Sequence, residues 1–297
     1  MIKINNKKVD IDHFPDGTLL LKDYLSEGYL SESFLSKHFI SKGFSADNSI
    51  EKNLNEKDPE IVIKWNYENN EELLVVYFLT RHLQAAGCRD LVLDMPYIPN
   101  ARQDRVKNPE DVFTLKYFAE LINSLGFAEV RVLDAHSHVS LALIDRVRQY
   151  TPQRYIESVI EEIGQRSGRK PLMFYPDEGA GKRYSGMIAL PYCFGIKNRD
   201  WSTGEIKSLS VAGETELIAG SDVLIVDDIC SYGGTFIRAA EALAAHGAAD
   251  IYLFVSHCEE SVFKGKLCEC GLIRQIYTTD SIFKDRENAK IKVLHTS

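Results

Sequence analysis

The chain has 297 residues, of which 44% are hydrophobic, and a formal net charge of -8 at pH 7. This length exceeds that of a usual single domain and predicts two domains, each with its own core. The negative charge argues against broad binding to nucleic acid or to an anionic membrane. No apolar run approaches the ~20 residues that span a bilayer, and the first residues lack the apolar core of a signal peptide, so we expect a cytoplasmic protein.

Helices and strands alternate in the first half of the chain. An amphipathic stretch predicts a helix over residues 71–86, and a short apolar run predicts a strand around residues 91–93. A second helix is expected from about residue 111 to residue 124, followed by a strand over residues 130–133. This rhythm indicates a parallel sheet with both faces covered by helices.

The same pattern restarts in the second half. Strands are predicted over residues 172–175 and 223–226, and the second of these runs directly into a pair of acids. A glycine-containing turn, an alanine-rich helix over residues 235–245 and a strand over residues 251–255 follow. Units of this kind place their functional loops at the carboxyl ends of the strands.

A domain boundary is expected where the polar sequence RQYTPQRY contains a proline, near residues 150–155. We assign residues 1–150 to an N-terminal domain and residues 151–285 to a C-terminal domain. Residues 45–59, rich in Asp, Asn, Glu and Lys, are expected to form a surface loop. The six cysteines include no CxxC pair, and we expect reduced thiols.

The segment VLIVDDICSYGGT, Val223–Thr235, carries the strongest functional signal: a buried strand, two carboxylates and a turn that opens a helix. Backbone N–H groups of the turn can bind a phosphate at the positive end of the helix, and Gly233 and Gly234 let the anion approach closely. Asp227 and Asp228 can accept hydrogen bonds from ribose hydroxyls or hold a metal ion. The alternative is a strand that ends in solvated acids before an ordinary turn. The complete pattern favours the phosphate site.

This segment resembles the ribose-phosphate-binding motif of the type I phosphoribosyltransferases and of the ribose-phosphate diphosphokinases, or PRPP synthetases. Other segments resemble the diphosphokinases in particular, in the same order along about residues 12–260. These are Phe14–Gly17 (family pattern FxDGE), Pro96–Arg105 (PYxxxARQDR), Leu133–Ser137 (DLHA), Tyr175–Arg183 (SPDxGGxxR) and Ile196–Arg199 (Lys-x-Arg).

The resemblance implies an α/β fold with two tandem phosphoribosyltransferase-like domains, each with a mostly parallel sheet flanked by helices. It implies that the end of the chain, residues 286–297, packs on the first domain. It also implies transfer of the β,γ-diphosphate of ATP to the C1 hydroxyl of ribose 5-phosphate, with Mg²⁺ as cofactor and AMP as the second product. The expected partners are ATP and an acceptor that contains ribose 5-phosphate, and we expect a homo-oligomer.

The resemblance also assigns roles to single residues. The ATP-binding residues are Phe14, Asp16, Arg102, Gln103 and Asp104, with Asp104 expected to fix Arg102. The catalytic residues are Lys197, Arg199 and His136. Lys197 and Arg199, expected on a mobile loop, would stabilise negative charge on the transferring phosphates. His136 and Asp177 are the expected metal ligands. The ribose-phosphate-binding residues are Asp227, Asp228, Ser231, Tyr232, Gly233, Gly234 and Thr235.

The turn over residues 231–235, called the acceptor turn below, departs from the family pattern DDIxDTAGT. Ser231 replaces the third acid of this pattern, and Tyr232 replaces its first threonine. One hypothesis is therefore an acceptor whose 5-phosphate is itself esterified, such as ADP-ribose, with Tyr232 as a stacking surface. Thr18 and Asn100 depart from the nucleotide-binding patterns. Two further alternatives are a phosphoribosyltransferase, against which the ARQDR segment speaks, and a non-catalytic regulatory homologue.

Overall fold

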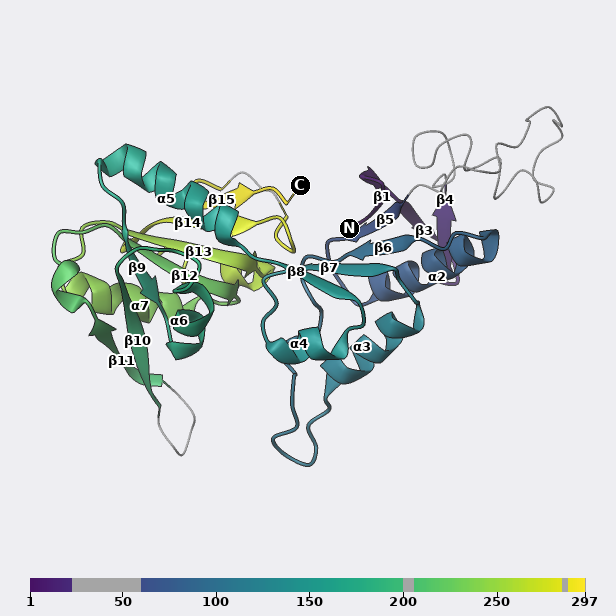
Figure 1. Ribbon diagram of the computed structural model, residues 1–297, viewed down its shortest axis with the longest axis horizontal. Coiled ribbons are helices and arrows are strands. Elements are labelled where there is room, and N and C mark those ends of the chain that lie inside the picture. The colour runs from purple at the N-terminus through teal and green to yellow at the C-terminus, as the bar shows by residue number, and fades with distance from the viewer. Residues whose placement is uncertain (23–59, 200–205, 285–287, 297) are drawn as a thin grey trace. The chain divides into compact units, whose positions relative to one another are not determined.

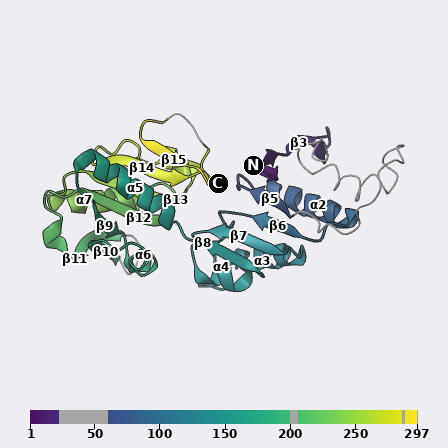
Figure 2. The ribbon, with the colours of Figure 1, turned by 45° about the horizontal axis from the view of Figure 1, so that its top comes forward.

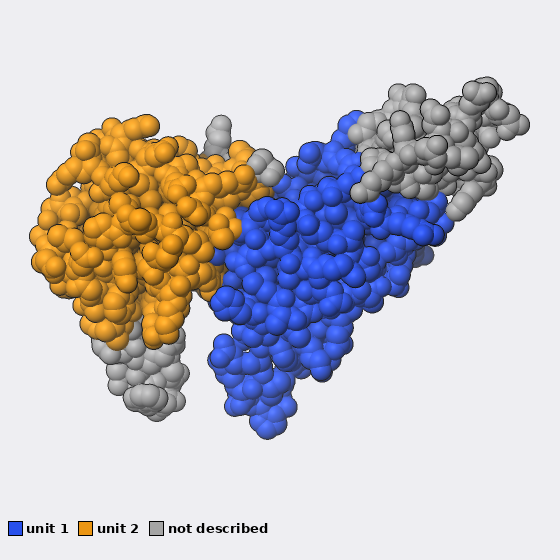
Figure 3. Space-filling view, in the orientation of Figure 1, with its two compact units in different colours: residues 1–150 blue, residues 151–297 orange. Residues whose placement is uncertain are grey.

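The computed structural model describes residues 1–22, 60–199, 206–284 and 288–296; the expected surface loop at residues 45–59 lies outside them. The chain divides after Tyr150 into two compact units, residues 1–150 and residues 151–297 (Figure 3). Within the described residues, no helix is long and apolar enough to cross a membrane.

The first unit contains a six-stranded sheet in the order β2-β1-β5-β6-β7-β8 (Figure 1). Its strands are β1 (Ile2–Ile4), β2 (Lys7–Lys8), β5 (Ile61–Trp65), β6 (Leu91–Asp94), β7 (Glu129–Leu133) and β8 (Val147–Tyr150). The strands from β5 to β8 are parallel, whereas β1 is antiparallel to both of its neighbours. The helices are α2 (Glu71–Ala86), α3 (Thr114–Ser124) and α4 (His138–Leu143), and β3 (Asp10–His13) and β4 (Leu19–Lys22) form a hairpin.

The helix predicted over residues 71–86 is confirmed as α2, whose apolar face joins the core at Val75, Leu79 and Leu83. Spacings of four residues place these side chains on one face of the helix. The next helix, α3, begins at Thr114 rather than near residue 111. Its start is displaced because the Asp111 carboxylate accepts the preceding N–H groups of residues 107 and 108 and closes a turn there.

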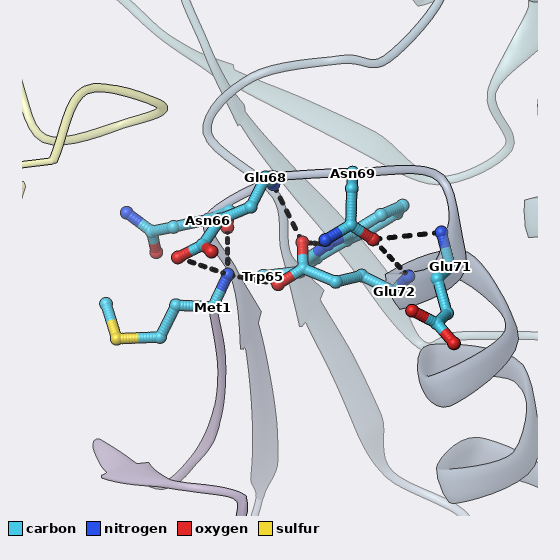
Figure 4. A network of polar contacts seen from close by, with 7 residues as sticks. All are labelled: Met1, Trp65, Asn66, Glu68, Asn69, Glu71 and Glu72. Atoms are coloured by element: carbon cyan, nitrogen blue, oxygen red, sulfur yellow. Dashed lines mark hydrogen bonds and ion pairs between the residues drawn. The ribbon is translucent and has the colours of Figure 1, made fainter. Parts of the chain in front are cut away.

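The start of α2 is fastened to β5 by the buried Glu72 carboxylate (Figure 4). Glu72 Oε2 accepts Trp65 Nε1–H at 3.0 Å and the Glu68 N–H at 2.7 Å. The Met1 ammonium contacts the other oxygen of Glu72, and Asn69 Oδ1 accepts the Glu72 N–H at 3.2 Å. A buried carboxylate needs such partners to offset its lost hydration, so this network fixes the helix against the sheet.

The second unit contains a seven-stranded sheet in the order β11-β10-β9-β12-β13-β14-β15. Its strands are β9 (Leu172–Tyr175), β10 (Tyr192–Arg199), β11 (Ile206–Gly213), β12 (Val223–Cys230), β13 (Ile251–Cys258), β14 (Ile273–Thr279) and β15 (Ile291–Leu294). Among the described strand pairings of this sheet, only that of β10 with β11 is antiparallel. The helices are α5 (Gln153–Ser167), α6 (Glu178–Tyr184) and α7 (Gly234–Ala245), with short 3-10 turns η2 (Thr215–Leu217) and η3 (Glu260–Lys264). Strands β13 and β14 lie side by side in Figures 1 and 2.

Both faces of this second sheet are buried, as a parallel sheet requires. Alternate residues of β9, β12 and β13 pack in one core cluster with apolar side chains of α7. On the opposite face, Tyr175 stacks on Tyr184 of α6, and Tyr277 Oη lies 3.2 Å from the Glu162 carboxylate of α5. The α/β class with two mostly parallel sheets is confirmed.

The end of the chain differs from the expectation that residues 286–297 pack on the first domain. Ile291–Leu294 forms β15, which pairs in parallel with β14 and joins the second sheet. The buried Ile291 side chain enters the core of that sheet, and Asp280 accepts the Thr296 N–H at 2.7 Å. Pairing with β15 satisfies backbone groups that β14 would otherwise leave open as an edge strand.

Candidate active site

The predicted residues of the acceptor site come together at the carboxyl ends of β9, β12 and β13, which are parallel neighbours in the sheet of the second unit. Asp177 follows β9, and Asp227 and Asp228 lie near the end of β12. The β12 strand is longer than predicted and continues to Cys230, paired with Cys258 of β13. The acids therefore lie within the strand, and the turn begins at Ser231.

The turn after β12 has the conformation expected of an anion-binding loop. Gly233 has φ 81° and precedes α7, and a Cβ atom there would lie 2.6 Å from the Leu267 side chain. Glycine is therefore required both by conformation and by space. Among the described residues, no hydrogen-bond acceptor is found for the backbone N–H groups of residues 232–235. These N–H groups, at the positive end of α7, are available to an anion.

The acids of the site are linked to one another and to Arg183. Arg183 Nη1 lies 2.9 Å from Asp228 Oδ2, and the Asp228 N–H donates to Asp227 Oδ1 at 3.0 Å. Asp177 caps α6, because its Oδ1 accepts the Ala180 N–H at 3.0 Å. Burial raises the pKa of Asp227 well above its usual range, and the carboxylates of Asp228 and Asp177 raise it further.

Two residues of this region were missed by the sequence analysis. Arg183 lay in a matched segment without an assigned role. Glu259, directly after β13, receives a hydrogen bond from the Ser231 hydroxyl, with Oγ and Oε2 2.5 Å apart. An acid immediately after a strand that neighbours β12 was the available signal. Tyr232, with 60% of its surface exposed, is the large aromatic side chain of the turn.

In the first unit, the ends of β6 and β7 bring together segments that are distant in sequence. The Leu133 N–H donates to the Pro96 carbonyl at 2.9 Å, which joins the last residue of β7 to the loop that follows β6. Asp134 has φ 43°, a conformation that strains a non-glycine residue, and its N–H donates to the Tyr150 carbonyl at 2.9 Å. His136 lies two residues after this strained residue. It lies close enough to Asp104 to affect its pKa.

The arginine partner of Asp104 differs from the expected one. Asp104 Oδ1 accepts Arg105 Nε–H at 2.9 Å, whereas Arg102 was the partner expected from the sequence. Burial alone would raise the pKa of Asp104, but the hydrogen bond from Arg105, with further effects of Ser137 and His136, lowers it below its usual range. Arg102 and Gln103 are exposed. Asp104 therefore anchors the loop, and its neighbours face solvent.

The other nucleotide-binding candidates lie on the turn of the β3/β4 hairpin. The Phe14 N–H donates to the Thr18 carbonyl at 2.9 Å, and the Thr18 N–H donates to Asp16 Oδ1 at 2.9 Å. This hydrogen bond lowers the pKa of Asp16. The Phe14 side chain is half exposed, so an aromatic face is accessible on the same turn as Asp16.

The backbone of Lys197 and Arg199 belongs to β10, where the sequence analysis placed a mobile loop. Lys197 pairs with Leu209 and Arg199 with Ile206 of β11. The β-branched and apolar residues of β11 favour this antiparallel pairing. The side chains of Lys197 and Arg199 lie outside the described part of the structure.

Within the described ranges, no group of three or more His, Cys, Asp or Glu side chains forms a ready metal site. A Mg²⁺ ion that binds substrate phosphates needs only one or two carboxylates from the protein. Asp177 and Asp227 fit this requirement, since mutual repulsion among the acids contributes to the raised pKa of Asp227. The six cysteines are free, and four of them are buried.

Comparison with known proteins agrees with this geometry. Residues 41–126 match the family described as the N-terminal domain of ribose phosphate pyrophosphokinase, and residues 187–265 match the phosphoribosyl transferase domain. A ribose-phosphate pyrophosphokinase of Sulfurisphaera tokodaii is 30% identical over 214 residues, which cover 68% of this chain and 68% of that protein. The chain belongs to the ribose-phosphate pyrophosphokinase family.

Further relatives of this ribose-phosphate pyrophosphokinase family member cover a larger share of the chain. The ribose-phosphate pyrophosphokinase of Bradyrhizobium diazoefficiens is 27% identical over 246 residues, 79% of this chain and 75% of that protein. The crystal structure of phosphoribosylpyrophosphate synthetase from Mycobacterium smegmatis has the same fold. Its TM-score is 0.71 at 18% identity, with 97% of this chain and 86% of that chain covered. The family resemblance found in the sequence is confirmed, and with it the assignment to a class of enzymes.

Proposed function

We propose that the protein transfers the β,γ-diphosphate of ATP to the C1 hydroxyl of ribose 5-phosphate and releases AMP. The observation that carries the proposal is the turn after β12, where N–H groups that have no acceptor within the described part of the chain follow Asp227 and Asp228. Such a turn binds the acceptor's 5-phosphate, and the two acids accept hydrogen bonds from its ribose hydroxyls. Membership in the ribose-phosphate pyrophosphokinase family supports the reaction class.

In the proposed reaction, the C1 hydroxyl oxygen forms a bond to the β-phosphorus of ATP and loses its proton. The bond between this phosphorus and the oxygen that bridges it to the α-phosphate breaks, and AMP leaves with that electron pair. Negative charge builds on the transferring and leaving phosphates, so positioned cations stabilise the transition state. Lys197 and Arg199 are the proposed cations. The proposed nucleotide-binding residues are Phe14, Asp16, Arg102 and Gln103. Asp104 anchors the loop that carries Arg102 and Gln103.

We propose Mg²⁺ as the cofactor. Asp177 and Asp227 are the residues of the second unit that would hold an ion, and His136 is the proposed metal ligand of the first unit. When bound, the ion neutralises phosphate charge and orients the diphosphate group. The observation that favours a cation is the raised pKa of Asp227 beside Asp228 and Asp177, because a divalent cation relieves the repulsion among these acids. The homo-oligomeric state and the cytoplasmic location expected from the sequence stay predictions.

The test is product analysis with ATP, ribose 5-phosphate and Mg²⁺ in the absence of any nucleobase. We expect AMP and the 1-diphosphorylated sugar in equal amounts, and no product in excess chelator until Mg²⁺ is restored. A phosphoribosyltransferase would instead require a base and the preformed activated sugar. A non-catalytic homologue would release no AMP with any acceptor. Formation of ADP instead of AMP, or turnover that persists in excess chelator, contradicts the proposal.

A second candidate acceptor is a ribose whose 5-phosphate is esterified, such as ADP-ribose. The exposed Tyr232 favours it, because an aromatic ring at the phosphate end of the site offers a stacking surface to a further group. Turnover of ribose 5-phosphate and ADP-ribose is compared under identical conditions, in the wild type and in Tyr232→Thr. A preference for ADP-ribose that the substitution removes supports this candidate. Absence of AMP release with ADP-ribose eliminates it.

A further inference from the structure

Glu259 occupies the position after β13 that Ser231 occupies after β12. The two strands are parallel neighbours, and their register pairs Cys230 with Cys258, the residues directly before Ser231 and Glu259. The Glu259 N–H donates to the Cys230 carbonyl at 2.8 Å, and the Ser231 hydroxyl donates to Glu259 Oε2 at 2.5 Å. Glu259 therefore contacts both sides of the Cys230–Ser231 peptide bond, where the acceptor turn begins.

The Glu259 carboxylate is itself held in place. The Ser261 hydroxyl donates to the same Oε2 atom at 3.1 Å, and the Glu259 side chain is half buried at the start of η3. Because hydrogen bonds to a charged acceptor are stronger than neutral ones, the Ser231 hydroxyl is committed to this carboxylate. The bond fixes the first residue of the turn rather than leaving it to solvent.

The segment that follows Glu259 also supports the later residues of the turn. A Cβ atom on Gly265 would lie 2.1 Å from the Tyr232 carbonyl oxygen, and one on Gly233 would lie 2.6 Å from the Leu267 side chain. The segment from residue 259 to residue 267 thus lies directly against the backbone of the turn. A turn held in this way presents its N–H groups without a further loss of conformational entropy on binding.

We propose that Glu259 is a positioning residue for the acceptor, and that through Ser231 it supplies from the neighbouring strand the acid that the sequence lacks at position 231. The inference rests on the proposed function, because it assigns to the turn the role of binding the acceptor's phosphate. Glu259 acts through Ser231 and the turn backbone, not on the reacting atoms. Its loss affects the KM for the acceptor more than kcat or the KM for ATP.

Moving the acid between the two positions tests the proposal. Glu259→Gln weakens the bond from Ser231 by removing its charge, and we expect the acceptor KM to rise about tenfold. Ser231→Asp brings two carboxylates into contact and is expected to raise the same KM by at least about tenfold. The double variant Ser231→Asp/Glu259→Gln restores one acid and one donor with the direction of the hydrogen bond reversed. We expect its acceptor KM to return to within about threefold of the wild type.

The control is Glu241→Gln, which removes the same charge from an exposed position on α7 and should leave both KM values unchanged. Thermal unfolding of every variant separates loss of fold from loss of positioning. A double variant no better than the worse single variant overturns the inference. So does a Glu259→Gln protein with an unchanged acceptor KM.

The proposed function is judged separately by the wild type, through AMP release. If the wild type releases no AMP, the proposed function fails. The wild type, the two single variants and the double variant are then compared by calorimetric titration with ribose 5-phosphate alone. Recovery of binding in the double variant supports the inference, and absence of recovery overturns it.

Discussion

Arg183 Nη1 lies 2.9 Å from Asp228 Oδ2. Asp228 belongs to β12, the strand that leads into the acceptor turn. The Asp228 side chain is 5% exposed and that of Arg183 is 24% exposed. A carboxylate this deeply buried stays ionised only with a partner, so Arg183 keeps Asp228 able to accept hydrogen bonds from a ligand. The ion pair thus stabilises the second unit and also keeps a proposed ligand-binding carboxylate in place.

Removal of Arg183 should destabilise the protein, because it leaves a buried carboxylate without its cation. We expect Arg183→Met to lower the free energy of unfolding by about 3 kcal/mol. In the Asp228→Asn background the same substitution should have a much smaller effect, since no buried charge remains. Urea unfolding measures both values. Lys182→Met, which breaks the exposed pair with Glu178, is the control and should change stability by less than about 0.5 kcal/mol. Equal effects of Arg183→Met in the two backgrounds would contradict the pairing.

The raised pKa of Asp227 predicts a specific dependence of stability on pH. The folded protein binds the proton of Asp227 more tightly than the unfolded chain does, because the pKa of Asp227 in the unfolded chain lies near 3.8. The free energy of unfolding therefore falls as pH rises from that value through the raised folded pKa. Asp227→Asn removes this decline. The free energy of unfolding of Asp227→Asn, relative to that of the wild type, should increase between the unfolded and the folded pKa of Asp227 and then stay constant. The variant should also lose activity.

Urea unfolding at a series of pH values measures this difference. Asp145→Asn, at an exposed position of the first unit, is the control for the loss of one acid. Added Mg²⁺ should stabilise the wild type more than Asp227→Asn. Parallel pH curves for the wild type and Asp227→Asn would show that the Asp227 carboxyl does not carry the effect.

Much of the fold was predictable from local sequence because periodicity and strand length are local properties. The helix at Glu71–Ala86 and the strand at Leu172–Tyr175 were found with the bounds that the structure has. The β15 strand was not predicted, since its place depends on pairing with β14, which no local pattern encodes. The extension of β12 to Cys230 likewise depends on its neighbour β13, whose register continues past the two acids.

The proposed site was predictable where a motif is contiguous and unpredictable where a contact joins two strands. The turn after β12 was found from one segment of sequence, and the structure places Gly233 in the left-handed conformation such a turn needs. Neither the Arg183–Asp228 pair nor the Ser231–Glu259 bond has a local signature. Asp104 was assigned to Arg102, whereas the structure shows an ion pair between Asp104 and Arg105, because spacing alone does not determine which neighbouring side chain reaches the carboxylate.

Arg102 and Arg105 should separate nucleotide binding from loop stability. Arg102 is exposed beside the buried Asp104, whereas Arg105 is the ion-pair partner of that carboxylate. We expect Arg102→Ala to raise the KM for ATP at least about tenfold, the scale of one lost charged hydrogen bond, with the acceptor KM unchanged. Arg105→Ala should lower stability by about 1 kcal/mol, since the Arg105 side chain is largely solvated. Steady-state kinetics and urea unfolding distinguish the two. A larger ATP effect from Arg105→Ala would reverse the assignment.

Lys197 provides the most direct test of the proposed transition-state chemistry. A cation that contacts the transferring phosphates only as charge develops should affect kcat rather than binding, so Lys197→Ala should lower turnover by at least about 10²-fold while ATP binding is largely kept. Initial rates of AMP release and calorimetric titration with ATP measure the two quantities. Lys182→Ala is the matched control, because this lysine is 75% exposed and pairs with Glu178 on the surface of α6. Parallel losses of ATP affinity and turnover in Lys197→Ala would assign Lys197 to substrate docking, because the interaction would then be present before the transition state forms.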